Sequence, residues 1–449
     1  MPPAERLGLL RLLSTLKRNP LECWSADFFE QPVVRVKLPF ADAFLVHDPC
    51  AIKHVLVDNA ANYRKDPIQR RILSAGLGDG LLSAEGERWD VQRRTLAPLF
   101  ARRTVTGLTT AMLAAAQGFV ERWRRFAPGE VIDVAAEMTL LTLNVLALTI
   151  FSDGLSSDVD EFRLAMNAYF ATIGRIGVLD LFNVPVVPRP GRRRLKQTMS
   201  YFEGVIDDII AVRQPRLASA RSSEPAGDLL TLLLGALDPS TGRPMSLIEV
   251  RSNILTFLSA GHETTANTLS WSLYLLSQSP EWAARVRDEA DRELARPNDG
   301  LVDRLVATRA VVDEALRLYP PIAALSRSAE QADRLGPQTI PRRALIVVSP
   351  YVLHRHRTLW ERPDVFDPSR FMPESKGRVH RYAYLPFGAG PRTCIGSSFA
   401  LQEATLVLAM LMHHYDLTLA PGAKVWPQQK ITLRPGDALS MRIAPRRAN

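Results

Sequence analysis

The feature that most restricts the fold of this chain is a continuous helical pattern between Ser246 and Gln278. It begins with a capping box, in which Ser246 is the N-cap and Glu249 stands three residues later. It ends before Pro280, which lacks the backbone N–H that a helix interior needs. About 30 residues at about 1.5 Å each make a helix about 45 Å long, which must cross the whole body of a large domain. We therefore expect a mainly helical fold arranged around this helix.

The centre of this helix has an unusual composition. Residues 260–265 read Ala-Gly-His-Glu-Thr-Thr, and glycine, an acid and two β-branched hydroxyl residues are poor choices for a buried helix. Residues that disfavour a buried helix are usually kept there for function. We therefore predict a functional site at the middle of the helix.

The remaining patterns predict a single domain over residues 1–449. The chain is mostly helical from Glu85 to about Asp303, and short strand-like segments precede and follow that stretch, at 34–38, 43–46, 344–348, 415–419 and 431–442. The late strands need the early ones to build a sheet, and the sequence contains neither an internal repeat nor a flexible linker. The expected fold class is mainly α with small β-sheets.

Composition excludes several classes of protein. With 46% hydrophobic and 23% charged residues, the chain is neither disordered nor collagen-like. Three cysteines cannot form a disulfide framework, which favours a reducing compartment. The net charge of +9 comes from scattered residues, so we expect no nucleic-acid partner. Polar residues interrupt the longest apolar run, 139–151, which predicts a buried core helix and no transmembrane segment.

A second unusual segment, residues 387–396, reads Phe-Gly-Ala-Gly-Pro-Arg-Thr-Cys-Ile-Gly and precedes a helical pattern from Ser397 to Met412. Its glycines allow a large flat group to approach the backbone closely. Amides at the helix start can donate hydrogen bonds to a Cys394 thiolate and lower its pKa. His354 and His356 do not complete a zinc spacing with this cysteine. A lone thiolate suits a metal that a macrocycle already holds, and an inert loop cysteine is the alternative.

Five residues of this loop, Phe387, Gly390, Arg392, Cys394 and Gly396, match the signature of the haem-binding loop of cytochrome P450 monooxygenases. Four other segments agree in the family's order: Trp89 and Arg93 in its W-x-x-x-R helix, residues 260–265 in its oxygen-activating helix, Glu314 and Arg317 in its E-x-x-R motif, and residues 367–371 in the segment that supplies a second arginine. Over essentially its whole length, the chain resembles the soluble bacterial type of this family. The resemblance implies the family's single-domain prism fold, with a long helix crossing above the haem.

The resemblance also implies haem b (iron protoporphyrin IX) as the cofactor. Cys394 is then the proximal iron ligand, which pushes electron density onto the metal and favours O–O cleavage. The two propionates need cationic and hydrogen-bonding partners, and the implied ones are Trp89, Arg93, Arg327 and Arg392. Further cofactor contacts are expected from Ala260, Gly261, Phe387, Gly388 and Gly396.

The implied catalytic residues are Glu263 and Thr264. Dioxygen must receive protons before its O–O bond breaks, and a threonine hydroxyl beside an acid can link it to a water chain from bulk solvent. A helix kink with a back-bonded hydroxyl is the structural alternative, and both can hold together.

Glu314, Arg317 and Arg370 resemble the family's buried Glu–Arg–Arg network behind the haem. The match is incomplete, since Ser369 stands where the family often has glutamate. His354 is one further candidate for a propionate contact.

The same resemblance implies a hydrophobic small-molecule substrate and O2, with one oxygen atom inserted by C–H hydroxylation or epoxidation. The segments expected to line the cavity are 68–82, 169–181, 255–260, 322–326 and 432–435, and they are mostly apolar. The alternatives are a peroxygenase, an isomerase, a carbon–carbon coupling enzyme or a haem sensor without catalysis.

Residues 395–449 suffice for one helix and the last strands, so we expect no fused reductase. Electrons are then expected from a separate ferredoxin or flavodoxin, which docks near Arg93, Arg94, Arg102 and Arg103. The expected location is the bacterial cytoplasm.

Overall fold

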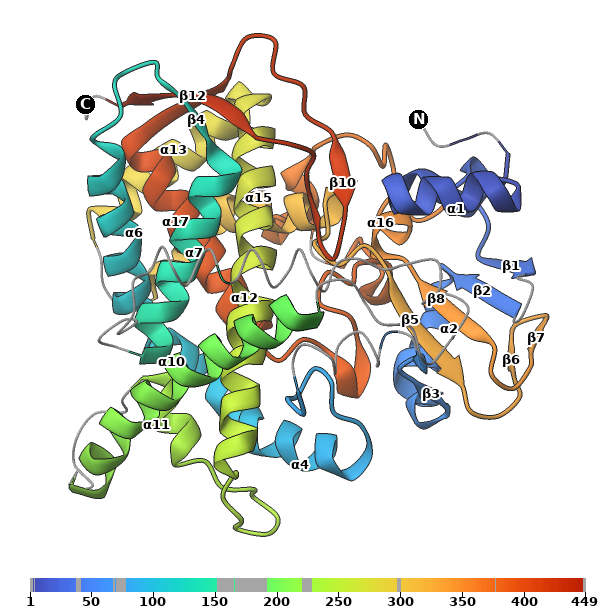
Figure 1. Cartoon of the computed structure of the whole chain (residues 1–449). Helices are drawn as coiled ribbons and strands as arrows, with labels where there is room; N and C mark the ends of the chain where they lie inside the picture. Colours follow the sequence, from blue (N-terminus) through green and yellow to red (C-terminus); the bar gives the residue numbers. More distant parts are fainter. Residues whose placement is uncertain are drawn as a thin grey trace.

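The predicted long helix is present as α12 (Leu247–Ser277), which contacts α7 (Val134–Phe151), α15 (Val306–Leu318) and α17 (Ser397–His414) (Figure 1). The Ser246 hydroxyl accepts from the N–H of Glu249, and the Glu249 carboxylate accepts from the N–H of Ser246, so the capping box is complete. The structure is a computed structural model that describes residues 3, 5–37, 42–67, 69, 78–151, 165, 192–219, 228–296, 300–375 and 377–446.

Helices make up most of the described chain. They are α1 (Leu9–Arg18), α2 (Pro49–Lys53), α4 (Gly86–Leu96), α5 (Arg102–Thr106), α6 (Thr109–Trp123), α7 (Val134–Phe151), α10 (Arg192–Ser219), α11 (Leu229–Leu234), α13 (Pro280–Leu294), α14 (Leu301–Arg304), α15 (Val306–Leu318), α16 (Pro350–Leu353) and α17 (Ser397–His414). The largest hydrophobic core lies among α6, α7, α12, α13, α15 and α17.

Helix α7 contains the apolar run that the sequence predicts to be a core helix. By length and composition it is the candidate membrane span within the described ranges, with a mean hydropathy of 1.8. Of that window, 67% is buried inside the fold, where Met138, Leu141 and Val145 belong to the main core. A core helix of a globular protein has the same properties.

The strands form small sheets beside the helices (Figure 1). The largest has the order β1-β2-β8-β5-β3, and a second has the order β4-β12-β9; two hairpins, β6-β7 and β10-β11, complete the set. Their bounds are β1 (Val33–Lys37), β2 (Asp42–Val46), β3 (Tyr63–Arg64), β4 (Val131–Asp133), β5 (Leu325–Ala329), β6 (Asp333–Leu335), β7 (Gln338–Ile340), β8 (Leu345–Val348), β9 (Tyr415–Leu419), β10 (Pro427–Gln429), β11 (Leu433–Pro435) and β12 (Ser440–Pro445).

The late strand β8 pairs with an early one, as expected: it lies parallel to β2, with Ile346 opposite Phe44. Strand β12 pairs antiparallel with β4, whereas β10 and β11 pair with each other and need no early strand. The single strand expected at 431–442 is wrong, because β11 and β12 belong to different sheets. Helix α2, with Asp48 as its N-cap, ends at Lys53, and the chain continues as a π-type turn, η3 (His54–Asp58).

Candidate active site

Cys394 lies between the short turn η9 (Gly390–Arg392) and helix α17. Its N–H donates to the carbonyl of Phe387 at 2.9 Å, which closes the loop. Gly388 and Gly390 have φ values of 70° and 73°, so this loop requires glycine at both positions. A Cβ on Gly390 would lie 1.7 Å from the carbonyl oxygen of Leu56, so no side chain fits at this position.

The Cys394 side chain is exposed, although protein surrounds it on most sides. Burial raises the pKa of its thiol, and the N–H of Gly396 and the Arg93 guanidinium lower it by less. The expectation of a lowered thiol pKa is therefore wrong for the chain by itself. In a desolvated loop, one amide and one nearby cation do not offset the cost of a bare thiolate.

The unusual centre of α12 presents an accessible face. Ala260 is exposed and Glu263 and Thr264 are half-buried, whereas the flanking Ser259 and Thr265 are buried. An exposed alanine inside a mostly buried helix marks where another molecule can reach the core.

Gly261 has a packing explanation of its own. A Cβ at this position would lie 3.0 Å from Cδ1 of Leu146 in α7. The glycine therefore lets α7 and α12 approach closely, and this contact accounts for it without reference to a cofactor.

The acid and the alcohol of this helix have different partners. The Thr264 hydroxyl donates to the carbonyl of Ala260 at 2.8 Å, so the back-bonded arrangement is present. Glu263 Oε1 accepts a 2.8 Å hydrogen bond from Thr432, whose hydroxyl also accepts from Asn267 at 3.0 Å. Glu263 Oε2 is buried with no hydrogen-bond partner in the part of the chain that the structure describes.

Three cations gather beside α4 around one carboxylate. Arg392 pairs with Glu85 at 2.9 Å, and its guanidinium carbon lies 3.8 Å from the ring centroid of Trp89. Burial lowers the pKa of Arg327, and burial with neighbouring cations lowers those of Arg392 to about 10 and Lys65 to about 8. Asp66 also acts on Arg327 and Asp90 on Arg392, but burial still lowers the pKa of both arginines, so an added anion would be favourable here.

Lys65 is a member of this cluster that the sequence reading missed. Its side chain is 8% exposed, lies 3.6 Å from Glu85 and donates to the carbonyl of Leu82. No motif around Lys65 distinguishes it from other lysines, because its role depends on residues brought from elsewhere by folding. Arg93, which the sequence did identify, lies on α4 close enough to Cys394 to affect the thiol.

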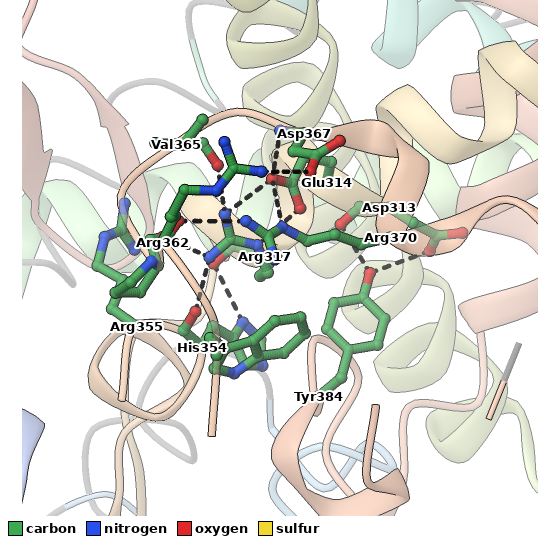
Figure 2. A network of polar contacts seen from close by, with 12 residues as sticks. Asp313, Glu314, Arg317, His354, Arg355, Arg362, Val365, Asp367, Arg370 and Tyr384 are labelled. Atoms are coloured by element: carbon green, nitrogen blue, oxygen red, sulfur yellow. Dashed lines mark hydrogen bonds and ion pairs between the residues drawn. The ribbon is translucent and has the colours of Figure 1, made fainter. Parts of the chain in front are cut away.

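The expected Glu–Arg–Arg network is present and deeply buried (Figure 2). Glu314 and Arg317, both 0% exposed, form a two-pronged ion pair with distances of 2.6 and 2.7 Å. Arg317 also donates to the carbonyls of His354 and Pro363, and Nε of Arg370 lies 3.7 Å from Glu314. The network thus ties α15 to the backbone of two later segments.

His354 takes part in this network (Figure 2). Its Nδ1 lies 3.2 Å from the carbonyl of Arg317, and its Nε2 accepts from the N–H of Leu385 at 2.8 Å. Burial and the nearby Arg317 lower the pKa of His354 to about 3, so the ring is neutral. With both nitrogens bound to backbone, the suggested propionate contact is wrong.

The segments expected to line a substrate cavity are only partly described. Positions 68, 70–77 and 169–181 lie outside the described residues. Ile322 is exposed, whereas Leu255 and Ala323 belong to hydrophobic cores. Thr432 contacts Glu263, which places the turn between β10 and β11 against the centre of α12.

The arginines expected to meet an electron donor differ in their surroundings. Arg94 pairs with Asp238 and Arg102 pairs with Asp303. Arg103, at the start of α5, is exposed. Within the described ranges, no group of three His, Cys, Asp or Glu side chains is arranged to hold a metal ion.

Comparison with known proteins covers nearly the whole chain. The family model described as cytochrome P450 matches residues 2–441. Cyclooctatin synthase of Streptomyces melanosporofaciens is 32% identical over 94% of this chain and 90% of its own length. The bifunctional cytochrome P450/NADPH–P450 reductase 2 of Bacillus subtilis is 30% identical over 100% of this chain and 43% of its own length.

A solved structure has the same architecture. The crystal structure of the haem domain of cytochrome P450DA aligns with a TM-score of 0.84 at 28% identity, covering 100% of this chain and 98% of that one. Family model, relatives and fold agree, and the chain belongs to the cytochrome P450 family.

Proposed function

We propose that this chain is a haem-thiolate monooxygenase in which Cys394 is the proximal ligand of the iron. As a cytochrome P450, it is an oxidoreductase with haem b as its cofactor, and it acts on a small molecule with dioxygen and electrons from a redox partner. The proposed reaction inserts one oxygen atom into a hydrophobic substrate by C–H hydroxylation or epoxidation. When bound, the haem supplies the iron that activates dioxygen, and thiolate ligation favours O–O cleavage.

The observation that carries this proposal is the exposed Cys394 thiol at the end of a glycine loop. The loop puts a single soft ligand at the start of α17, beside Arg93. With no other metal-ligating cluster in the described ranges, this arrangement suits an iron whose remaining ligands come from a porphyrin. Phe387, Gly388 and Gly396 belong to the same loop and are the proposed contacts on this face of the cofactor.

The cation cluster fits the two haem propionates. Lys65, Arg327 and Arg392 lie near Glu85, and burial lowers the pKa of each, so a further anion would stabilise their charged forms. Two carboxylates from the cofactor would supply that negative charge. We assign these three cations and Trp89 to propionate binding, and we place Arg93 beside them.

Glu263 and Thr264 are the proposed proton-handling groups. Ala260 and Gly261 precede them by one turn, and Ala260 opens this face of α12 to another molecule. The Thr264 hydroxyl, held by the Ala260 carbonyl, keeps its oxygen lone pairs available as acceptors. Glu263 keeps one oxygen without a partner in the described residues, and this oxygen is the proposed place for a proton in transit.

We further propose that a separate protein, a ferredoxin or a flavodoxin, donates the electrons. It docks on a surface of this chain that includes Arg103. Exposed positive charge favours an acidic partner. The proposed location is the bacterial cytoplasm, which agrees with three free cysteines, Cys23, Cys50 and Cys394.

The decisive experiment is the absorption spectrum of the reduced holoenzyme with carbon monoxide. We expect the band of a thiolate-ligated haem in the wild type and in Cys23→Ser and Cys50→Ser, which are matched cysteine controls. Cys394→Ser should lose that band. If Cys394→Ser keeps the wild-type spectrum, the ligand assignment is wrong. Turnover with a reductant and O2, compared with peroxide alone, then separates a monooxygenase from a peroxygenase.

A further inference from the structure

One carboxylate oxygen outside the active site binds three side chains from a single segment. Oδ2 of Asp333, the first residue of β6, lies 2.7 Å from the hydroxyl of Tyr63, 2.8 Å from Nε2 of His54 and 2.9 Å from Nδ2 of Asn59. Burial by itself would raise the pKa of Asp333, but these hydrogen bonds outweigh it and lower that pKa to about 2. The carboxylate is therefore charged, and it accepts from three donors at once.

These donors surround the π-type turn η3. His54 is its first residue, Asn59 follows its last, and the N–H of Asn59 donates to the carbonyl of His54 at 2.8 Å. Such turns are rare and occur frequently at functional sites. Val55 and Leu56, inside the turn, are 1% and 4% exposed. Asp333 thus holds both ends of a turn whose middle is buried.

The buried middle of this turn lies directly against the loop of Cys394. A Cβ on Gly390 would lie 1.7 Å from the carbonyl oxygen of Leu56 and 2.8 Å from its carbonyl carbon. The side chains of Val57 and Ala389 also pack against the hydrophobic cluster that contains Leu56. Backbone in contact with backbone leaves no flexible atoms to absorb a shift, so a displaced turn displaces the loop.

We propose that Asp333 is a positioning residue for the thiolate ligand. It acts through η3, whose Leu56 carbonyl fixes the position of Gly390, four residues before Cys394. The inference rests on the proposed function, because it requires Cys394 to be the ligand. It extends that function to a carboxylate in the β6-β7 hairpin, which carries none of the family motifs identified in the sequence.

The test measures how long thiolate ligation survives in the holoenzyme. The reduced carbon monoxide complex is followed at constant temperature until the thiolate band gives way to the band of a non-thiolate haem. Asp333→Ala, which removes the acceptor of all three hydrogen bonds, should make this conversion at least about tenfold faster. Tyr63→Phe, which removes one of the three, should accelerate it less, by about threefold.

Asp58→Asn is the matched control. Asp58 is an exposed acid of the same turn and pairs with the exposed Lys53. Its conversion rate should stay within about twofold of wild type, as expected for a surface pair. In parallel, urea unfolding followed by far-UV circular dichroism gives the unfolding rate of each variant. For Tyr63→Phe, the fold-increase in the conversion rate should exceed the fold-increase in the unfolding rate.

The outcomes separate this inference from the proposed function. A wild type without the thiolate band overturns both. A normal wild type in which Asp333→Ala and Tyr63→Phe convert no faster than Asp58→Asn overturns the positioning role alone. Conversion that merely follows global unfolding also overturns it. If Asp333→Ala does not retain haem, the conversion rates of Tyr63→Phe and Asp333→Asn test the positioning role instead. The rate of Asp333→Asn should lie above that of wild type but below about tenfold, because asparagine keeps one acceptor oxygen.

Discussion

Thr432 donates a hydrogen bond of 2.8 Å to Glu263, so the turn between β10 and β11 holds the acid at the centre of α12. The two residues are 169 positions apart in the chain. Asn267, one turn beyond Glu263, donates to the same hydroxyl. The position of the proposed proton-handling acid therefore depends on a hairpin near the end of the chain.

Replacing Thr432 with valine should destabilise the protein by about 1–3 kcal/mol, because Glu263 and Asn267 each lose a partner in a buried place. Urea unfolding measures this. Thr418→Val, at an exposed position of β9, is the control and should change stability by less than about 0.5 kcal/mol. Equal effects of the two substitutions would show that the contact contributes little.

Thr264→Ala should retain haem and bind substrate, but it should send reducing equivalents to hydrogen peroxide. Product formed per electron should fall about tenfold or more, since the hydroxyl proposed to take part in proton delivery is lost. Peroxide and product are measured with a substrate found by its shift of the haem spin state. Thr268→Ala, whose hydroxyl is back-bonded to the Thr264 carbonyl, is the control and should stay coupled. Full coupling in Thr264→Ala would contradict the proton role.

Arg317→Ala should cost about 3–5 kcal/mol of stability, because it leaves Glu314 as an uncompensated buried charge. The loss should be visible in the unfolding midpoint and in a lower haem content after purification. Arg124→Ala removes an exposed pair with Glu121 and should cost less than about 1 kcal/mol. Similar costs for both would mean that the network does not support the fold.

The unfolding free energy should decrease as the pH falls below about 6.5, partly through His354. Its pKa is about 3 in the folded chain against an ordinary value of 6.5 for histidine, so below pH 6.5 the unfolded chain binds a proton that the folded chain does not. Stability from this group is present above pH 6.5 and is lost toward pH 3. Between pH 7.5 and pH 5 the loss should be about 2 kcal/mol.

The check compares wild type with His354→Gln, which lacks a titrating ring, by urea unfolding over that pH range. The glutamine variant should be less stable at neutral pH and should show the shallower pH dependence. His380→Gln, at an exposed position, should keep the wild-type slope. An unchanged slope in His354→Gln would show that the ring is not neutral in the folded protein.

Arg103→Glu should slow electron transfer from an acidic ferredoxin severalfold at low ionic strength, and added salt should remove the difference. Stopped-flow reduction of the haem measures the rate. Arg342→Glu, with the same charge change on the turn before β8, is the control. Equal rates for the two variants would exclude Arg103 from the docking surface.

Features that depend on neighbours a few residues apart could be predicted from the sequence. The capping box starts α12 at Leu247, and Asp48 with Pro49 starts α2, because these signals act within one turn of helix. The tight loop before Cys394 could also be predicted from its glycines, because the left-handed backbone of Gly388 and Gly390 favours glycine at those positions. The Glu314–Arg317 pair is local as well, with one helical turn between its members.

Partners that come from distant parts of the chain could not be predicted. Strand β5 has weak strand character and half-buried side chains, and it forms because β8 and β3 pair with it. Lys65 joins Arg327 and Arg392 only after folding, and burial then changes its pKa. His354 is a candidate for a propionate contact in the sequence, whereas in the structure the backbone of Arg317 and Leu385 binds both of its nitrogens.

The sequence by itself thus determined the helical core, the cysteine loop and the family, since helix periodicity, caps and glycine backbone are properties of short segments. Tertiary structure decided which charges share a site, which residues hold Glu263 and what lies against Gly390. Burial and hydrogen bonding of these groups depend on atoms contributed by residues tens to hundreds of positions away, and no local pattern specifies which ones will meet.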